Sequence, residues 1–549
     1  MSDEKAVIVF SSIHIEKGPE ALPLGAASVA SAVQAAFRNA GENARYPPVR
    51  IVLEEHVLSD SPPLIAGDIL GHKPLAVGFS IYSWNRKLSC EAAKMIRAES
   101  PAVKLICGGP DVSALPAGLL VSEGGSFDCV IRGEGEKGMV RYLEDFFSGR
   151  NTEPVIAEPS MSADELAALP SPWLDGTLDA RGRDGVLLEL ARGCPYRCAY
   201  CYESKGEKRV RYFPEERMRD EIKTISRGAP ASVTVLDPTF NTDPRRALRI
   251  LNLIRTEAPD IHWHFEVRAE HLNREQARLF AGLGASLQIG LQSADEKVCE
   301  RIGRKFNRDL FASRISLLHE AGAAFGLDLI YGLPGDSLAG YRKSLDFALS
   351  LYPDHLDMFR LSVLPGTLLH DRAGELGILA EGQAPYLLIA APAFPREDLN
   401  EAEKLSWGTN LFYNTGRAVS WFNQVLYPLG IRPSRFLTDF TAFIPGLSAR
   451  ERRDSLEAEQ LQLSFLDRWY QKKGKDYLLP LIWDIVRFHG AWGRALAEGV
   501  STSIETQYAT EDVLNSAGED LEDYIEYIRP AAGRITLVPG KDAPEIREG

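Results

Sequence analysis

The sequence predicts an α/β protein built from three parts: an N-terminal doubly wound (Rossmann-like) domain, a central partial βα barrel of the TIM type, and a helical C-terminal domain. Three observations support this division. Short apolar runs alternate with helical stretches in the first ~145 residues, and again from residue 186 to about 385. After about residue 390 only helical periodicity remains, with many aromatic side chains. We place the boundaries at 1–150, 151–185 (a linker), 186–385 and 386–549.

The first part contains five short apolar runs that suit buried parallel strands. We expect strands at 6–10, 50–53, 75–81, 103–107 and 127–131, with helices at 24–37 and 87–98 among them. Glycine-rich turns follow the last two strands: Gly108-Gly109-Pro110 and Gly133-Glu134-Gly135-Glu136. Doubly wound sheets bind ligands at the carboxyl ends of their strands, where glycine lets the backbone approach a ligand closely.

The second alternation gives six βα units in about 190 residues, which favours a partial or complete barrel. It follows a linker containing four prolines, Pro154, Pro159, Pro170 and Pro172. The expected strands are 186–190, 233–236, 264–267, 286–291, 325–330 and 358–361. The expected helices between them are 214–226, 244–257, 274–283, 309–321 and 338–351. Active sites of such barrels lie at the strand carboxyl ends.

The last part should be helical and rich in buried aromatics. Trp407, Tyr413 and Trp421 could line a substrate cavity, although core packing is the more ordinary role for aromatic side chains. We expect the polar tail after about Pro530 to fray.

Length and charge exclude several classes of protein. A chain of 549 residues exceeds one compact core. With 62 Lys and Arg against 76 Asp and Glu, the net charge is −14, which argues against nucleic acid as the main partner. The sequence has no apolar run of the ~20 residues that a membrane span needs, and its N-terminus lacks the pattern of a signal peptide. We therefore expect a cytoplasmic protein without a membrane partner.

Three of the seven cysteines, Cys194, Cys198 and Cys201, lie within eight residues. Thiolates select zinc or iron–sulfur clusters. Structural zinc sites use four ligands, usually in two separated pairs, and the sequence has no second pair nearby. A [4Fe–4S] cluster with one open iron therefore fits best. The alternatives are three small buried side chains or an incomplete zinc knuckle. The remaining cysteines are expected in the core (Cys107, Cys129) or inert on helices (Cys90, Cys299).

The spacing Cys-x-x-x-Cys-x-aromatic-Cys after the first barrel strand resembles the radical S-adenosylmethionine (SAM) superfamily, over residues 185–385. The resemblance implies that the three cysteines hold a [4Fe–4S] cluster and that the next glycine- or acid-containing turns contact SAM. It departs at Gln292, where the family usually has glutamate. The SAM contacts that it implies are Tyr200, Asp237, Thr239, Glu266, Arg268, Gln292, Ser293 and Arg304.

The N-terminal domain placed before such a barrel resembles the cobalamin (B12)-binding branch of that superfamily. The implied cobalamin contacts follow the strand ends and are Ser80, Tyr82, Ser83, Trp84, Gly108, Gly109, Gly133 and Glu134. His14 lies where a cobalt-ligating histidine could stand, but the preceding aspartate is missing and the following glycine is one position late. We therefore expect cobalamin bound without histidine ligation.

The resemblance implies a methyltransferase that moves a methyl group from SAM through cobalamin to a carbon, or a similarly unreactive centre, of a small molecule or peptide. It also implies an electron donor such as flavodoxin or ferredoxin. Three alternatives stay open: a cyclase or rearrangement enzyme with the same cofactors, a tRNA methylthiotransferase-like enzyme, and a non-enzymatic cobalamin sensor. Poorly placed N-terminal cysteines and the acidic charge disfavour the second, and the three clustered cysteines disfavour the third.

Overall fold

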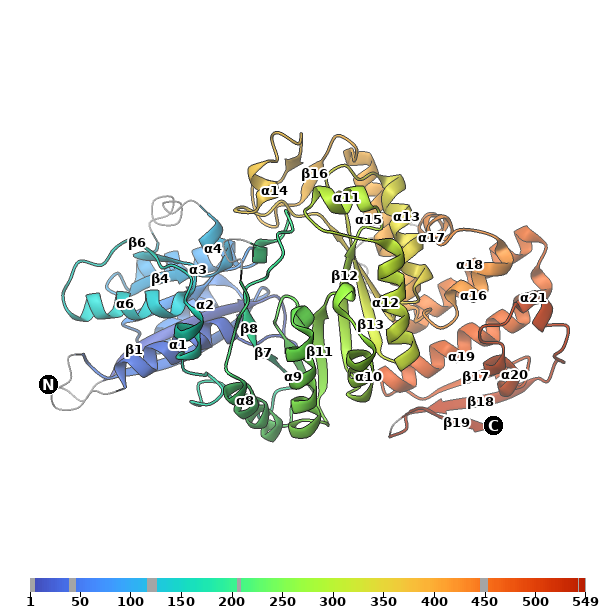
Figure 1. Cartoon of the computed structure of the whole chain (residues 1–549), viewed down its shortest axis with the longest axis horizontal. Helices are drawn as coiled ribbons and strands as arrows, with labels where there is room; N and C mark the ends of the chain where they lie inside the picture. Colours follow the sequence, from blue (N-terminus) through green and yellow to red (C-terminus); the bar gives the residue numbers. More distant parts are fainter. Residues whose placement is uncertain are drawn as a thin grey trace.

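The computed structural model describes residues 5–38, 46–115, 126–204, 209–444, 453–541 and 543–548. The molecule is elongated, with the N-terminal domain at one end, the barrel in the middle and the C-terminal helices at the other end (Figure 1). Within these residues, no helix combines the length and apolar character needed to cross a membrane.

The N-terminal domain is a six-stranded parallel sheet in the order β2-β1-β3-β4-β5-β6. Helices α1 and α6 cover one face, and α2 and α3 cover the other, as in a doubly wound fold. The strands are β1 (Ala6–His14), β2 (Val49–Val57), β3 (Ala76–Ser80), β4 (Lys104–Gly108), β5 (Cys129–Arg132) and β6 (Val155–Ala157). The helices are α1 (Leu24–Phe37), α2 (Pro62–Gly71), α3 (Arg86–Glu99), α4 (Pro110–Ala114) and α6 (Gly135–Phe147).

The five predicted strands of this domain are confirmed, and β6 is an addition. β6 lies in the proline-containing segment that we predicted to be a linker. There, the three residues Val155 to Ala157 pair with β5 at the edge of the sheet. The chain reverses its direction of travel across the sheet at β1, which has β2 on one side and β3 on the other. The carboxyl ends of β1 and β3 therefore form the switch point, where such sheets bind ligands.

The central part is a second parallel sheet, in the order β14-β13-β12-β11-β10-β7. No pairing joins β14 to β7 among the described residues, so the barrel is open and the partial-barrel prediction is confirmed. Its strands are β7 (Gly185–Leu188), β10 (Ser232–Val235), β11 (His262–Val267), β12 (Ser286–Gln292), β13 (Ala324–Tyr331) and β14 (His355–Arg360). The covering helices are α8 (Glu215–Gly228), α9 (Pro244–Glu257), α10 (Arg274–Gly282), α12 (Arg308–Ala321) and α13 (Leu338–Ser350).

Local sequence explains why the barrel helices begin where they do. The side chains of Asp243, Asn273, Asn307 and Ser337 each accept a hydrogen bond from a backbone N–H in the first turn of the helix that follows. Such caps satisfy donors that have no partner within the helix. In α9 the buried residues Ala247, Ile250, Leu251 and Ile254 recur at helical spacing and pack on the sheet.

The C-terminal part is mainly helical, as predicted, but it also contains a three-stranded antiparallel sheet. The helices are α15 (Arg396–Thr409), α16 (Phe422–Leu426), α17 (Pro433–Phe443), α18 (Ser455–Lys473), α19 (Leu479–Ala497), α20 (Thr510–Asn515) and α21 (Leu521–Tyr524). The strands are β17 (Thr502–Thr506), β18 (Gly533–Val538) and β19 (Glu545–Glu548).

The expectation that the tail after Pro530 frays is wrong for these strands. Ile535 and Leu537 alternate with polar residues along β18, and both are buried, with Ile535 opposite Ile504 of β17. Two anchoring side chains on one face hold the strand against the domain. Tyr413 and Trp421 are buried in the helical core, in the ordinary packing role.

Candidate active site

The three clustered cysteines lie on a loop that leaves the first barrel strand. The short strands β8 (Ala191–Arg192) and β9 (Arg211–Tyr212) pair antiparallel and hold the two ends of this loop together. In the middle of the loop the Ala199 N–H donates to the Ile302 carbonyl at 2.9 Å, and the Ala199 carbonyl accepts from the Leu369 N–H at 2.8 Å. The cysteine loop is therefore fixed at its centre as well as at its ends.

The thiol environments suit a bound metal centre better than three free cysteines. Cys198 is buried, and the pKa of the Cys201 thiol is raised to about 12, chiefly by burial and also by the neighbouring Cys198 and Cys194. Burial is also the main cause of the raised pKa of Cys194. The Cys194 and Cys201 thiols can therefore ionise together only beside a strong positive charge, which a metal cluster supplies.

The other cysteines lie as the sequence predicted. Cys107 and Cys129 are buried in strands β4 and β5 of the first sheet, and Cys90 lies on α3. Cys299 lies on α11 (Glu296–Arg301), where its Sγ donates to the Ser293 carbonyl at 3.3 Å.

Two of the predicted SAM contacts, Asp237 and Ser293, are committed to protein partners. Asp237 is buried, accepts from the Leu190 N–H at 2.8 Å and pairs with Arg246 at 3.3 Å. Ser293 is buried, and its Oγ accepts from the Asp295 N–H at 3.1 Å. Thr239 donates its hydroxyl to the Pro238 carbonyl at 2.6 Å and also hydrogen-bonds Cys194.

Two arginines, Arg268 and Arg304, bring positive charge close to the cysteine loop. The Arg268 guanidinium lies 3.9 Å from the ring centroid of Tyr196 in that loop and pairs with Glu270 at 3.2 Å. Arg304 is buried, donates to the Gly290 carbonyl and lies 3.9 Å from Glu270. Its Nε has no hydrogen-bond partner among the described residues. These groups could bind a carboxylate beside the cluster.

Gln292 ends β12 in a strained conformation. Its φ is +67°, an uncommon value for a residue with a Cβ, and its buried Oε1 lacks a hydrogen-bond partner within the described part of the chain. Strain of this kind collects at ligand sites. Tyr200 sits half-buried in the cysteine loop, packed against the barrel core.

Acidic side chains line the lumen of the open barrel. Glu266 on β11 lines a lumen cavity of about 400 Å³. The pKa of Glu266 is raised to about 7, first by burial and second by the neighbouring carboxylate of Asp328 on β13. Burial likewise raises the pKa of Asp328 to about 6, although a hydrogen bond from Gln288 opposes the shift. The lumen thus holds two carboxyl groups that change charge near neutral pH.

An apolar cavity of about 240 Å³ lies at the switch point of the N-terminal sheet. Its floor is open because Gly78 carries no side chain: a Cβ there would lie 3.0 Å from the Phe10 ring. Gly109 has φ +117°, and a Cβ on it would lie 2.4 Å from the Ile81 carbonyl oxygen. Six of the predicted cobalamin contacts line the cavity: Ser80, Tyr82, Gly108, Gly109, Gly133 and Glu134.

The two remaining predicted contacts, Ser83 and Trp84, are not among the cavity-lining residues. Trp84 stacks on Tyr82, with ring centroids 4.4 Å apart, and so supports the cavity wall from behind. The apolar, glycine-rich wall and the flanking hydroxyls suit a flat heteroaromatic group such as the nucleotide tail of cobalamin.

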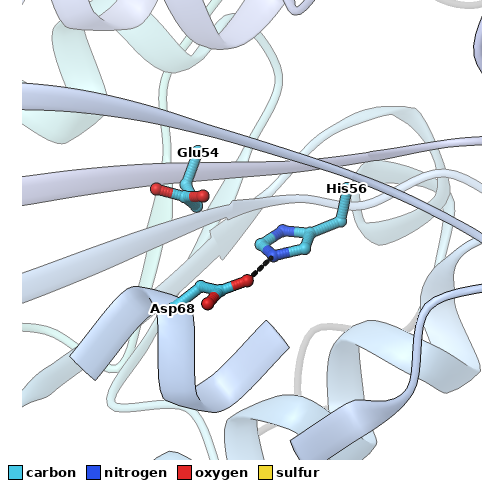
Figure 2. A group of neighbouring side chains, drawn as sticks. All are labelled: Glu54, His56 and Asp68. Carbon is cyan, nitrogen blue, oxygen red and sulfur yellow. Dashed lines mark hydrogen bonds and ion pairs between the residues drawn. The ribbon is translucent and has the colours of Figure 1, made fainter. Parts of the chain in front are cut away.

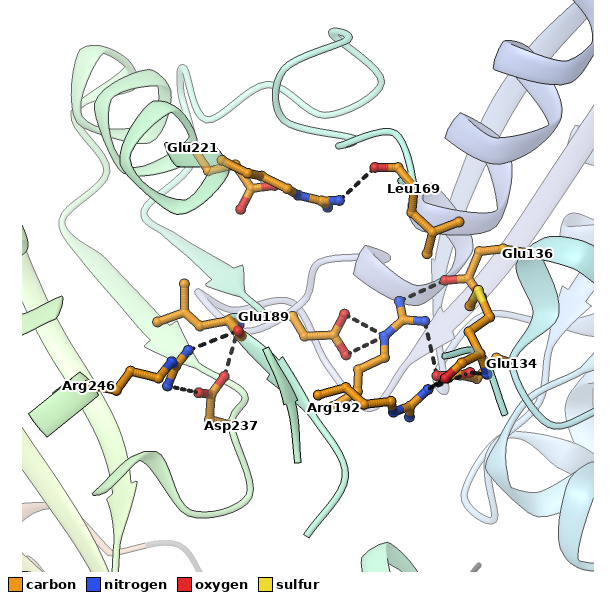
Figure 3. Close-up of polar contacts among 12 residues, drawn as sticks. Glu134, Glu136, Leu169, Glu189, Arg192, Glu221, Asp237 and Arg246 are labelled. Atoms are coloured by element: carbon orange, nitrogen blue, oxygen red, sulfur yellow. Dashed lines mark hydrogen bonds and ion pairs between the residues drawn. The ribbon is translucent and has the colours of Figure 1, made fainter. Parts of the chain in front are cut away.

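Arg192 joins this cavity to the cysteine loop (Figure 3). It lines the cavity and lies two residues before Cys194. Its guanidinium pairs with Glu189 at 3.0 Å, Glu136 at 2.7 Å and Glu134 at 3.4 Å. The charges therefore connect the first turn of α6 in one domain with the start of the cysteine loop in the other.

Glu134 is held on several sides. Burial raises its pKa, but hydrogen bonds from Arg211 and the Met161 N–H, together with the charge of Arg192, bring the pKa below its usual range. The distances are 2.9 Å to Arg211 and 2.7 Å to Met161. Glu134 thus supports the cavity as an ionised interdomain contact.

Four members of this network were not predicted from the sequence: Arg192, Arg211, Glu136 and Glu189. A signal was present, since charged residues flank both the cysteine motif and the Gly133-to-Glu136 turn. Local patterns, however, offer no reason to pair residues more than 50 positions apart.

Replacing Arg192 with methionine is expected to lower the free energy of unfolding by about 3 kcal/mol, because Glu136 would stay buried without a cation. Denaturant unfolding of the full chain measures this loss. Arg183→Met is the control, since Arg183 forms a partly exposed ion pair with Glu55 at 2.8 Å and should cost about 1 kcal/mol or less. Equal losses in the two variants would contradict a special role for Arg192.

Comparison with known proteins agrees with both halves of the site. Residues 15–143 match the B12 binding domain, and residues 188–348 match the Radical SAM superfamily. A relative, the cobalamin-dependent radical SAM methyltransferase TokK of Streptomyces tokunonensis, is 27% identical over 333 residues. That match covers 54% of this chain and 48% of the relative, so the chain spans about half of that protein's length.

Two solved structures share the fold. The methyltransferase TsrM from Kitasatospora setae, solved with cobalamin and a [4Fe–4S] cluster, gives a TM-score of 0.52 at 18% identity, over 69% of this chain and 81% of that one. Apo OxsB, a cobalamin-dependent S-adenosylmethionine radical enzyme, gives a TM-score of 0.58 at 13% identity, over 96% of this chain and 82% of that one. The chain thus contains a stretch that matches the B12 binding domain, residues 15–143, followed by a stretch that matches the Radical SAM superfamily, residues 188–348.

Proposed function

We propose that this protein is a cobalamin-dependent radical SAM methyltransferase. It would move a methyl group from SAM, by way of cobalamin, to a carbon or similarly unreactive centre of a small molecule or peptide. The observation that carries the proposal is Arg192, which lines the switch-point cavity and begins the cysteine loop. In this proposal one side chain borders both cofactor sites, which suits a reaction that uses both cofactors on one substrate.

In this proposal Cys194, Cys198 and Cys201 hold the [4Fe–4S] cluster. Arg268 and Arg304 attract the SAM carboxylate, while Glu266, Gln292, Tyr200 and Thr239 contact the rest of SAM. Asp237 and Ser293 act by positioning, since each secures a strand end through its protein hydrogen bonds. When bound, the cluster with SAM supplies radical chemistry and cobalamin supplies a methyl group; the chain orients the groups and excludes water.

The proposal includes cobalamin without a histidine ligand. His14 pairs with Glu55 at 3.3 Å and lines a different pocket from the switch-point cavity. Ser80, Tyr82 and the glycine turns after β4 and β5 would instead enclose the nucleotide tail.

We also propose a cytoplasmic setting and an electron donor such as flavodoxin or ferredoxin, because the cluster can deliver an electron only after receiving one. Nucleic acid is not the proposed substrate, since the net charge of −14 opposes a phosphate backbone.

A label-transfer experiment tests the proposal without knowledge of the substrate. The anaerobically reconstituted, cobalamin-loaded and reduced protein is incubated with SAM labelled in its methyl group. We expect the label in the bound corrinoid. Cleavage of SAM to 5′-deoxyadenosine without any label in the corrinoid would reject methyl transfer and favour a cyclase or rearrangement enzyme.

The raised pKa of Glu266 predicts how SAM binding depends on pH. Below its pKa of about 7 this carboxyl is neutral, and above it the carboxylate attracts the SAM ammonium group. SAM affinity of the cluster-loaded protein should therefore rise about tenfold from pH 6 to pH 8, as gain of one charge-assisted hydrogen bond suggests. Equilibrium binding at several pH values measures this change.

Two matched variants test this assignment. In Glu266→Gln, SAM affinity should no longer change with pH, and in Glu270→Gln the pH dependence should be the same as in the unmodified protein. Burial raises the pKa of Glu270, but its pairing with Arg268 outweighs burial and brings the pKa below normal, so Glu270 is already ionised at pH 6. A profile unchanged by Glu266→Gln would remove Glu266 from the SAM site.

A further inference from the structure

A second group of ligand-type side chains lies in the N-terminal domain, on the edge strand β2 and the helix α2 (Figure 2). Glu54 and His56 are two residues apart on β2, so both side chains point to the same face of the sheet. Asp68 on α2 and His72 at its C-cap are four residues apart, so both lie on one side of that helix. The strand face and the helix side meet and bring two imidazoles and two carboxylates together.

The contacts are short and connect all four residues. His56 Nε2 lies 3.3 Å from Asp68 Oδ2, and His72 Nε2 lies 2.7 Å from Glu54 Oε2. One potential ligand atom each of Glu54, His56 and Asp68 lies within 4.8 Å of the others. Glu54, His56 and Asp68 therefore form a single cluster, which His72 contacts through Glu54.

The state of His56 points to a missing partner. Its side chain is only 4% exposed, and its Nδ1 has no hydrogen-bond partner among the residues that the structure describes. Figure 2 shows the nitrogen-bearing edge of the ring turned toward Glu54 and Asp68. A buried ring nitrogen without a partner is costly, and native proteins rarely leave one without a reason.

We propose that Glu54, His56 and Asp68 form a binding site for a divalent transition metal ion of the zinc type, with His72 holding Glu54 in position. One imidazole and two carboxylates make a mixed nitrogen and oxygen ligand set that zinc accepts, and water takes the fourth tetrahedral position. Magnesium and calcium prefer sites made of oxygen alone. Ligand atoms about 2.0 Å from a zinc ion would draw inward from their present separation by small side-chain rotations.

The surroundings supply an entry path and a favourable charge. A pocket of about 410 Å³ borders the cluster, and its wall includes Glu54, His56 and Asp68. Asp60 adds a carboxylate to the same pocket, against one lysine, Lys17; Glu55 also lies on its wall but is paired with Arg183 at 2.8 Å. The local field therefore attracts a cation.

The position of the cluster suggests what the ion does. β2 is the edge strand of its sheet, with β1 as its hydrogen-bonded neighbour among the described strands. An ion held by β2 and α2 would fasten that edge to the helix covering it, far along the chain from the cysteine loop. It would be a structural site, independent of the two cofactors that the active site takes.

Zinc binding to the full-length protein with its [4Fe–4S] cluster in place tests the site. Competition with a chromophoric chelator gives the affinity, and elemental analysis after desalting gives zinc and iron per chain. We expect about one zinc per chain, with the iron content unchanged. His56→Ala should weaken zinc binding at least tenfold, as should Asp68→Asn, a milder change at a half-exposed side chain.

The matched control is His14→Ala. His14 lines the same pocket but pairs with Glu55, so zinc affinity should stay unchanged. Added zinc should also raise the unfolding temperature of the unmodified protein and of His14→Ala, but not that of His56→Ala. The proposal is overturned if the unmodified protein takes up no zinc beyond the cluster site, or if His56→Ala and Asp68→Asn bind zinc as tightly as the unmodified protein.

Discussion

Cys198→Ala should abolish the iron–sulfur cluster and, with it, all cleavage of SAM. Cys198 is the middle ligand of the three, is buried, and precedes Ala199, whose two backbone hydrogen bonds fix the centre of the loop. Two remaining thiols cannot hold a cluster that needs three. After anaerobic reconstitution, iron should fall from about four per chain to background, together with the visible absorption of the cluster.

Cys90→Ala is the control for this experiment, since Cys90 lies on α3 in the other domain. It should retain iron, absorption and SAM cleavage. If Cys198→Ala kept its cluster and cleaved SAM, or if the unmodified protein held zinc in the cysteine loop, the assignment of the three cysteines would fail.

Gly25→Leu should prevent cobalamin from binding while leaving the cluster intact. Gly25 is the second residue of α1 and lines the switch-point cavity. A Cβ at this position would meet the Tyr82 hydroxyl at 3.6 Å, an ordinary contact, so the backbone tolerates the change. The rest of the leucine side chain would occupy the space that the nucleotide tail needs. We expect at least a 100-fold loss of affinity, about 2.7 kcal/mol.

Gly67→Leu is the matched control, because Gly67 lies on α2 and a Cβ there meets nothing within 4 Å. Cobalamin binding is measured by its absorption after gel filtration, and iron is counted in the same samples. Both variants should hold the same iron as the unmodified protein. Normal cobalamin binding by Gly25→Leu would place the cofactor elsewhere.

Features that depend on neighbouring residues could be predicted from the sequence. The buried runs at residues 6–10 and 233–236 form strands of parallel sheets, as their apolar character predicts, and the spacing of the three cysteines identifies the loop that we propose for the cluster. The glycines after β4 are recognisable because a backbone turn like that of Gly109, with φ +117°, excludes other residues.

Other features could not be predicted, because nothing in the local pattern encodes them. β6 has only three residues and lies in a proline-rich segment. It forms because the backbone of β5 has free hydrogen-bonding groups on that side, with which β6 pairs. β18 and β19 resemble a polar tail in the sequence, since one face of β18 and all four residues of β19 are open to solvent. Asp237 and Ser293 stand at sequence positions that predict contacts with SAM. Only the structure shows that they are buried and accept hydrogen bonds from backbone N–H groups of Leu190 and Asp295.

The two parallel sheets, the order of the domains and the clustering of Cys194, Cys198 and Cys201 follow from the amino-acid order, since periodicity and spacing act within a few residues along the chain. How the two cofactor sites are joined depends instead on the three-dimensional arrangement. Arg192 meets Glu134 and Glu136 across more than 50 residues of chain, and Glu54 meets Asp68 and His72 across a strand and a helix. Charges find such partners through space, and their pairing follows from how the domains pack.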